Sequence, residues 1–171
     1  MAKELKMMVG IPGSGKSTWA IAEKERLQNE GKMVAYISRD EIRFSLVEDN
    51  EDYFSREKEV FNKFIQVTQA ALNSLDKDVV IIDATHISPA SRRKVLNRLN
   101  SLSDICLTLE VMDVPTSICL ERNASREGRA KVPDFAILNM AENFEVPHDE
   151  FKNNNYGFKT VTVNIYSYKK E

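Results

Sequence analysis

The residues from Gly10 to Thr18 read GIPGSGKST and form the clearest chemical pattern in this chain. Glycines at this spacing let the backbone curl so that its N–H groups surround an anion. A lysine followed by a hydroxyl residue then supplies a cation for phosphate and a ligand for a divalent metal. A short apolar run ends at Val9, and a helix-compatible run follows from Lys16. This context indicates a nucleotide-binding phosphate loop and disfavours an ordinary glycine-rich turn.

The loop predicts a set of contacts with ATP, or another nucleoside triphosphate, and Mg²⁺. The Lys16 side chain is expected to reach the β and γ phosphates, and the Ser17 hydroxyl is expected to ligate the metal. The positive end of the following helix adds to the attraction for phosphate. The residues expected to bind the nucleotide through this loop are Gly13, Ser14, Gly15, Lys16, Ser17 and Thr18.

An acid, Asp40, follows the predicted strand 32–37. In open α/β sheets, ligands bind at the carboxyl ends of the strands, so Asp40 is expected to face the same cleft as the phosphate loop. Two interpretations remain open from the local sequence. Asp40 is a functional acid, or Ser38 or Asp40 is the N-cap of a helix over 41–47.

A second acid, Asp83, ends the continuous apolar strand 78–83 and resembles a Walker B element. It is expected to hold a water of the magnesium shell, with Thr85 and His86 on the next loop near the reacting phosphate. The alternative for His86 is a loop residue before a helix, since Ser88 and Pro89 are typical of an N-cap and a first helical position.

The remaining pattern predicts an α/β fold with a central, mostly parallel, five-stranded sheet and helices on both faces. A helix over 51–75 carries phenylalanines that we assign to the core. A helix over 88–102 carries basic residues that we assign to a solvated face. The basic residues of the 88–102 helix are Arg92, Arg93, Lys94 and Arg98. The prediction is completed by a strand over 105–114, a helix opened by Pro115 and Thr116, a helix over 132–144 and a final strand over 158–166.

An irregular basic stretch, about 122–132, is predicted to form a mobile lid over the nucleotide phosphates. Gly128 and Pro133 interrupt it, and lids are commonly built from such stretches. Arginine side chains suit the charge that spreads over a phosphoryl group during transfer. The cations of this stretch are Arg122, Arg126, Arg129 and Lys131.

The composition is that of a soluble protein with 171 residues, 42% of them hydrophobic and 29% charged. This length predicts a single domain over 1–171. No apolar run is long enough for a membrane span, and the first residues do not resemble a signal peptide, so we expect a cytoplasmic protein. The formal charge of −2 disfavours an extended basic surface for nucleic acid but allows a local site for one strand end. Cys106 and Cys119 are expected to be buried thiols.

Four separated motifs resemble the 5'-kinase domain of the T-even phage polynucleotide kinase-phosphatase and its relatives. They are GIPGSGKSTWA, SRDEIR, IDATHISPASRR and MDVPTSICLERNASREGRAKVP, in the order found in that family and within residues 5–151. The resemblance implies transfer of the γ-phosphoryl group of a nucleoside triphosphate to the 5'-hydroxyl end of DNA or RNA during strand repair. The DxDxT signature of the 3'-phosphatase is absent, so no phosphatase activity is expected.

The same resemblance implies roles for individual residues. Asp40 would be the general base, Arg43 would hold the 3'-phosphate of the acceptor, and Arg126 would be the lid arginine. Arg122 and Val132 would sandwich the adenine. The lid is one residue longer than in the phage family, and the acid of DATH lies one position earlier.

A non-enzymatic nucleotide-binding module stays possible but leaves Asp40 unexplained, and two other functions compete with this prediction. One is a kinase of a small metabolite or of a protein toxin target on the same fold. Arg43 beside Asp40 argues against this function, because the pair provides both the base and the phosphate anchor that an oligonucleotide acceptor needs. The other is a nucleotide-hydrolysing switch, whose DxxG and guanine-specificity motifs are missing. DNA versus RNA preference, the preferred triphosphate and the oligomeric state, including a homo-oligomer, stay open.

Overall fold

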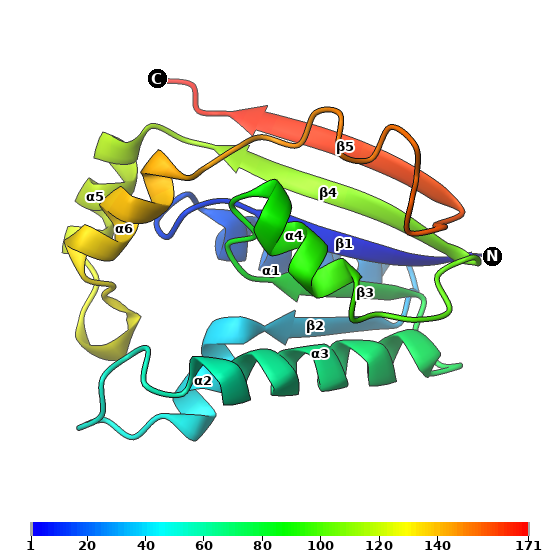
Figure 1. Cartoon of the computed structure of the whole chain (residues 1–171), viewed down its shortest axis with the longest axis horizontal. Helices are drawn as coiled ribbons and strands as arrows, with labels where there is room; N and C mark the ends of the chain where they lie inside the picture. Colours follow the sequence, from blue (N-terminus) through cyan, green and yellow to red (C-terminus); the bar gives the residue numbers. More distant parts are fainter. Residues whose placement is uncertain (1, 171) are drawn as a thin grey trace.

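The computed structural model describes residues 2–170 and contains one parallel β-sheet within them. Its strand order is β2-β3-β1-β4-β5, and each neighbouring pair is parallel (Figure 1). The predicted five-stranded α/β sheet is therefore confirmed. The strands are β1 (Lys3–Val9), β2 (Val34–Ser38), β3 (Val79–Asp83), β4 (Ile105–Asp113) and β5 (Thr160–Ser167).

Helices connect the parallel strands and cover the sheet on both sides, as crossover connections require. Figure 1 shows α3 and α4 in front of the sheet and α1 behind it, with α5 and α6 beyond the carboxyl ends of the strands. The helices are α1 (Lys16–Asn29), α2 (Arg39–Leu46), α3 (Glu57–Asn73), α4 (Pro89–Leu96), α5 (Thr116–Ala124) and α6 (Asp134–Glu142), with a 3₁₀ turn at Gly128–Ala130.

Three apolar clusters hold these layers together. The largest joins one face of the sheet to Phe61 and Phe64 of α3 and to Leu96 of α4. A smaller cluster joins the opposite face to Ala20 and Leu27 of α1. The third packs α5 and α6 against the phosphate loop through Ile11, Cys119, Val132, Ala136 and Ile137. The carboxyl edge of the sheet, where the acids lie, is thus fixed by core packing from both sides.

Several predicted elements need correction. The helix predicted over 51–75 begins at Glu57, because 51–56 form turns. It ends at Asn73, so Leu75 lies beyond it and is fully exposed. The helix predicted over 88–102 ends at Leu96. Cys119 is buried as expected, whereas Cys106 is only half-buried.

The solvated basic face predicted for α4 is wrong for Arg92, which is 0% exposed. Its guanidinium donates to the carbonyl oxygens of His86 (2.7 Å) and Glu145 (3.0 Å) and pairs with Glu150. Buried backbone carbonyls far apart in the sequence need donors, and a long forked side chain supplies several at once. Arg92 therefore fastens the loop after β3 to the segment that precedes β5.

Within residues 2–170, no helix combines the length and the apolar composition that crossing a membrane requires.

Candidate active site

The phosphate loop lies between β1 and α1 and has the backbone of an anion cradle. Gly13 and Gly15 have φ angles of 85° and 90°, which side-chain-bearing residues rarely adopt. A Cβ atom at Gly13 would lie 2.5 Å from the carbonyl oxygen of Cys119, so α5 packs directly on this glycine. No side chain caps the N-terminus of α1. Its first N–H groups are therefore available to a phosphate.

Lys16 and Ser17 open α1 and meet Asp83 at the end of β3. The Ser17 hydroxyl donates to Asp83 Oδ2 at 2.7 Å, and Lys16 Nζ lies 3.8 Å from Asp83 Oδ1. Tyr36 of β2 donates to the same Oδ2 at 2.5 Å. Burial of the Tyr36 ring and the charge of Asp83 raise the pKa of this phenol, so Tyr36 stays a donor at ordinary pH.

The oxygen atoms of Asp83 and Ser17 suit the coordination of Mg²⁺. Asp83 is buried, and its Oδ1 atom accepts no hydrogen bond within the described part of the chain. A buried carboxylate oxygen without a donor suits a hydrated hard cation, and the Ser17 hydroxyl supplies a second oxygen. No cluster of three or more metal-binding side chains was found among the described residues. In kinases, Mg²⁺ is commonly held by one or two protein groups together with nucleotide phosphates.

Asp40 lies in the first turn of α2, but it is not the helix cap. Ser38 is the N-cap, since its hydroxyl accepts from the N–H of Glu41 at 3.2 Å. The capping alternative is therefore confirmed for Ser38 and wrong for Asp40. The Asp40 side chain is half exposed and belongs to the lining of the cleft described below.

Arg43, one turn after Asp40, is buried among partners. Its Nε and Nη2 atoms form a two-pronged pair with Glu57 of α3, at 2.8 and 3.0 Å. Its Nη1 atom donates to Asp40 Oδ1 and to the Tyr53 hydroxyl, the latter at 3.1 Å. The Tyr53 hydroxyl donates to the same Asp40 oxygen at 2.8 Å. Asp40, Arg43, Tyr53 and Glu57 thus form one network, the acceptor-side network.

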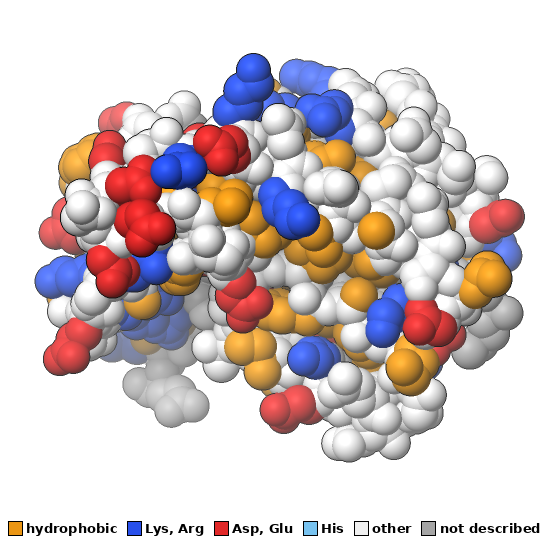
Figure 2. All heavy atoms as spheres, turned by 90° about the horizontal axis from the view of Figure 1, so that it is seen from below, with side chains coloured by type: hydrophobic (Ala, Val, Ile, Leu, Met, Phe, Trp, Pro, Cys, Tyr) orange, Lys and Arg blue, Asp and Glu red, His pale blue; other side chains and the backbone are white. Residues whose placement is uncertain are grey.

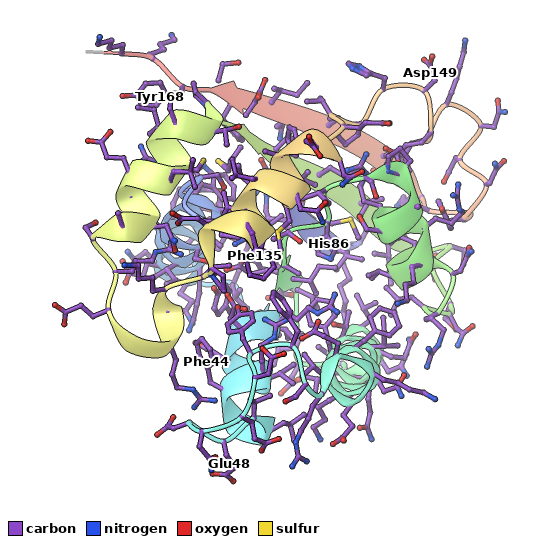
Figure 3. The ribbon with its side chains drawn as sticks, turned by 60° about the vertical axis from the view of Figure 1, so that its left-hand side comes forward. Phe44, Glu48, His86, Phe135, Asp149 and Tyr168 are labelled. Carbon is purple, nitrogen blue, oxygen red and sulfur yellow. The ribbon has the colours of Figure 1, made fainter. Side chains whose placement is uncertain are left out.

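A single cleft joins this network to the phosphate loop. It has a volume of about 160 Å³ and continues past Arg43 and Tyr53 toward the Gly128–Pro133 stretch. Figure 3 shows α2, which carries Phe44, facing the α5–α6 end of the molecule, where Phe135 lies. The lining includes Lys16, Ser17, Asp83 and Thr85 on the phosphate side, Arg39, Asp40, Arg43, Tyr53, Phe54 and Glu57 opposite, and Val132 and Met140 from the lid side.

His86 is placed differently from Thr85, since it does not line this cleft. The His86 ring is 3% exposed, and its Nδ1 atom donates to the carbonyl oxygen of Met8 at 2.7 Å. Nδ1 carries the proton because a carbonyl oxygen only accepts. Burial lowers the pKa of His86 to about 3, with Arg39, Arg92 and Lys16 adding to the effect. This neutral, enclosed ring gives no support to the predicted substrate contact.

The predicted lid residues have separate surroundings. Arg122 donates to the carbonyl oxygen of Gly13 at 3.1 Å and lies over the ring of Tyr168, 5.8 Å from its centroid. Val132 instead lines the cleft; its carbonyl oxygen accepts from Asn123 Nδ2 at 2.7 Å, and its N–H donates to Asn123 Oδ1 at 3.0 Å. Arg122 and Val132 therefore contact different neighbours, which does not support the predicted adenine sandwich.

Two further arginines of this stretch differ from each other. Arg129 donates to the carbonyl oxygens of Phe44 (3.0 Å) and Val47 at the end of α2. Arg126 is exposed, and no hydrogen bond or ion pair of its guanidinium is recorded within residues 2–170. It does not line the cleft in this structure.

Sequence reasoning missed several residues of the cleft. Arg39 adjoins Asp40 within the SRDEIR motif, so its position could have been found. Tyr53 and Phe54 were assigned to a helix, but they lie in turns before it, and this is what lets them reach α2. Glu57 and Tyr36 carry no local signal of their roles, which arise only when α3 and β2 pack beside α2 and β3.

The family model of the AAA domain, AAA_33, matches residues 5–147. The chain belongs to this AAA domain family. Its matched region includes the phosphate loop, both strand-end acids and the lid stretch. The site described above is therefore that of a P-loop, kinase-like AAA domain.

Solved structures similar to this AAA domain include several kinases. A sugar kinase from Janibacter sp. HTCC2649 has 11% identity and a TM-score of 0.60, with 98% of this chain and 86% of that chain covered. The APS kinase CysC of Mycobacterium tuberculosis, in complex with AMPPNP and APS, has 16% identity and a TM-score of 0.56, with 95% and 88% covered. These likenesses show the fold.

A chain of the Pnkp1/Rnl/Hen1 complex has higher identity, 26%, and a TM-score of 0.56. The match covers 71% of this AAA domain and 39% of that chain, so the neighbour is a much longer protein. Together, the family and the similar structures support nucleotide binding and a kinase-type fold. The kinases among these structures are named for acceptors of different chemistry.

Proposed function

We propose that this protein is a polynucleotide 5'-kinase, which transfers the γ-phosphoryl group of ATP or another nucleoside triphosphate to 5'-hydroxyl ends of DNA or RNA. The observation that carries the proposal is the shared cleft, in which Lys16 and Ser17 face Asp40 and Arg43. A kinase needs a triphosphate site and a hydroxyl-orienting base within reach of each other. A switch that uses only water has no need of the acceptor-side network.

In the proposed reaction, the acceptor hydroxyl lies between Asp40 and the γ-phosphorus. The Asp40 carboxylate orients the hydroxyl and accepts its proton as the new O–P bond forms, while the bond to the β-phosphate oxygen breaks. Lys16 and the loop N–H groups stabilise the phosphate charge. Ser17 and Asp83 would hold Mg²⁺, which would supply positive charge beside the phosphates. Arg126 would add a cation when the lid lies over the nucleotide.

The polynucleotide acceptor is favoured by the four motifs that resemble 5'-kinase domains and by the likeness to a chain of the Pnkp1/Rnl/Hen1 complex, described for a related structure as an RNA repair complex. The proposal includes no 3'-phosphatase activity, and a cytoplasmic location would suit a repair enzyme.

A small-metabolite kinase is the second candidate, and two observations favour it. Arg43, the proposed anchor for the acceptor's 3'-phosphate, is already paired with Glu57 and Asp40. The acidic residues Glu48, Asp49 and Glu51 also line the continuation of the cleft toward Gly128–Pro133 and would repel a polyanion. Figure 2 shows acidic side chains gathered at the left end of the molecule and no continuous basic surface on that face.

An acceptor panel decides between these functions. Purified protein is incubated with labelled ATP and Mg²⁺, and with 5'-hydroxyl DNA or RNA oligomers, a nucleoside 3'-phosphate, bare nucleosides, sugars or water. The polynucleotide proposal expects transfer to oligomers and to the nucleoside 3'-phosphate, and lower transfer by Arg43→Ala to these acceptors. Efficient transfer only to an uncharged metabolite would replace it with the second candidate.

The role of Asp40 is tested in the same assay. Asp40→Asn should lower kcat roughly a hundredfold to ten-thousandfold, because the amide cannot accept the proton. ATP affinity and the melting temperature should stay unchanged, since Ser38 and not Asp40 caps α2. An Asp40→Asn protein with normal turnover would remove Asp40 from the mechanism.

A further inference from the structure

Asp40 presents its two carboxylate oxygens to different surroundings. Oδ1 accepts from the Arg43 guanidinium and from the Tyr53 hydroxyl at 2.8 Å, and no protein donor to Oδ2 is recorded within residues 2–170. Two donors from different elements fix the carboxylate plane, since a single bond would leave it free to rotate. The unengaged oxygen is then the one available to an acceptor hydroxyl.

Tyr53 is itself held firmly. Its ring packs edge-on against Phe54, with centroids 4.6 Å apart, and against Phe44 at 6.2 Å. The Arg43 guanidinium lies over its face, 4.6 Å from the ring centroid. The hydroxyl accepts from Arg43 and donates to Asp40, so both of its hydrogen-bonding functions are used within the network. Such a side chain can hold its neighbour in one orientation.

The Tyr53 hydroxyl is also protonated at neutral pH and can donate. Burial and the adjacent Asp40 charge raise the pKa of its phenol, although Arg43 acts in the opposite direction. The charged groups that line the cleft beside it are Asp40, Arg43 and Arg39 of α2 and Glu57 of α3. A phenol that stays protonated beside a carboxylate orients that carboxylate by donating a hydrogen bond and does not act as an acid.

We infer that Tyr53 is a positioning residue of the acceptor site: its hydroxyl, with Arg43, fixes Asp40 through Oδ1 so that Oδ2 receives the proton of the acceptor hydroxyl. The inference rests on the proposed role of Asp40 as the base, but it does not depend on the identity of the acceptor. It predicts that Tyr53 acts on turnover only through Asp40.

The test is a double-mutant cycle of Tyr53→Phe and Asp40→Asn, with transfer to the best acceptor of the panel as the readout. Tyr53→Phe keeps the ring packing and removes only the hydroxyl. We expect kcat to fall roughly tenfold or more, the scale of a lost hydrogen bond to a charged group, with KM for ATP unchanged. Added to Asp40→Asn, it should cause no further loss of kcat.

Tyr156→Phe is the matched control, because this tyrosine packs on Phe151 and Phe158 away from the cleft. It should leave kcat unchanged. Normal kcat in Tyr53→Phe, or an equal additional loss in the Asp40→Asn background, would overturn the inference. Normal turnover in Asp40→Asn alone would instead overturn the proposed base, so the two failures are distinguishable. If Tyr53→Phe raises KM for ATP as well as lowering kcat, Tyr53 serves the fold of the whole site and the inference also fails.

Discussion

At the scale of single residues, the phosphate loop contains a glycine that has no room for a Cβ atom. Gly13 combines a φ of 85° with a contact to the backbone of Cys119, so it is restricted both by its own backbone and by α5. Gly31, which ends α1, has nearly the same φ of 86°, but a Cβ atom added there would have no neighbour within 4 Å. The two glycines therefore separate backbone strain from close packing.

Gly13→Ala should lose ATP binding as well as stability, because the Cβ would displace either the loop or α5. Gly31→Ala should cost only about 1–2 kcal/mol of unfolding free energy, the strain of a left-handed residue, and should bind ATP normally. Calorimetric titration with ATP and denaturant unfolding measure both quantities. Unimpaired ATP binding by Gly13→Ala would show that the loop tolerates a shift of α5.

The sequence predicted the phosphate side of the site better than the acceptor side. Lys16, Ser17 and Asp83 meet because a local motif and a strand end fix them, and the structure brings them within hydrogen-bond or ion-pair distance. Arg43, in contrast, was expected to be free for a phosphate, and its pairing with Glu57 crosses from α2 to α3. Such a contact depends on helix packing, about which helical periodicity says nothing.

At the scale of elements, the lid stretch and α2 are joined by one arginine. Arg129 donates to carbonyl oxygens at the end of α2, lies over the Phe44 ring at 4.8 Å and is 3.3 Å from Asp49. A guanidinium suits the unpaired carbonyls and negative end of a helix. We propose that this contact couples the lid to the helix that carries Asp40.

Arg129→Ala should loosen this coupling and lower kcat several-fold, while the fold and the phosphate loop remain intact. Hydrogen exchange should become faster in residues 125–133 and at the end of α2. Lys131→Ala is the matched control, since it removes a charge from the same stretch and the Lys131 side chain forms no hydrogen bond or ion pair within residues 2–170. Equal exchange rates in Arg129→Ala and the unmodified protein would rule out the coupling.

At the scale of the whole molecule, the element order and the parallel sheet followed from the sequence, whereas the buried polar groups did not. The runs around Val9, Ile37 and Ile82 predicted β1, β2 and β3, because central parallel strands are apolar on both faces. Arg92 and His86 look like surface or loop residues locally. They are buried because the loop after β3 lies under the 145–150 segment, a long-range arrangement.

Burial of neutral His86 should make folding sensitive to acid. Its pKa is about 3 in the folded chain and about 6.5 when unfolded. The unfolded state therefore binds more protons below pH 6.5, so stability is complete above that pH and falls as the pH drops toward 3. Between pH 7 and pH 5, the lowered pKa of His86 should reduce the free energy of unfolding by about 2 kcal/mol.

Urea unfolding at several pH values measures this loss. His86→Gln, whose amide can still donate to the Met8 carbonyl, should lose less stability between pH 7 and pH 5 than the unmodified protein. The control is His148→Gln, at the exposed second histidine. A pH dependence that is unchanged in His86→Gln would mean that other groups cause the acid sensitivity.

The central place of β1 has a consequence for synthesis on the ribosome. β1 is made well before its partners β3 and β4, which begin at Val79 and Ile105. At about 5–20 residues per second, its apolar residues wait several seconds for a partner. During that interval the segment from Leu5 to Val9 is an unpaired hydrophobic strand, the kind of surface that chaperones bind and that aggregates form from.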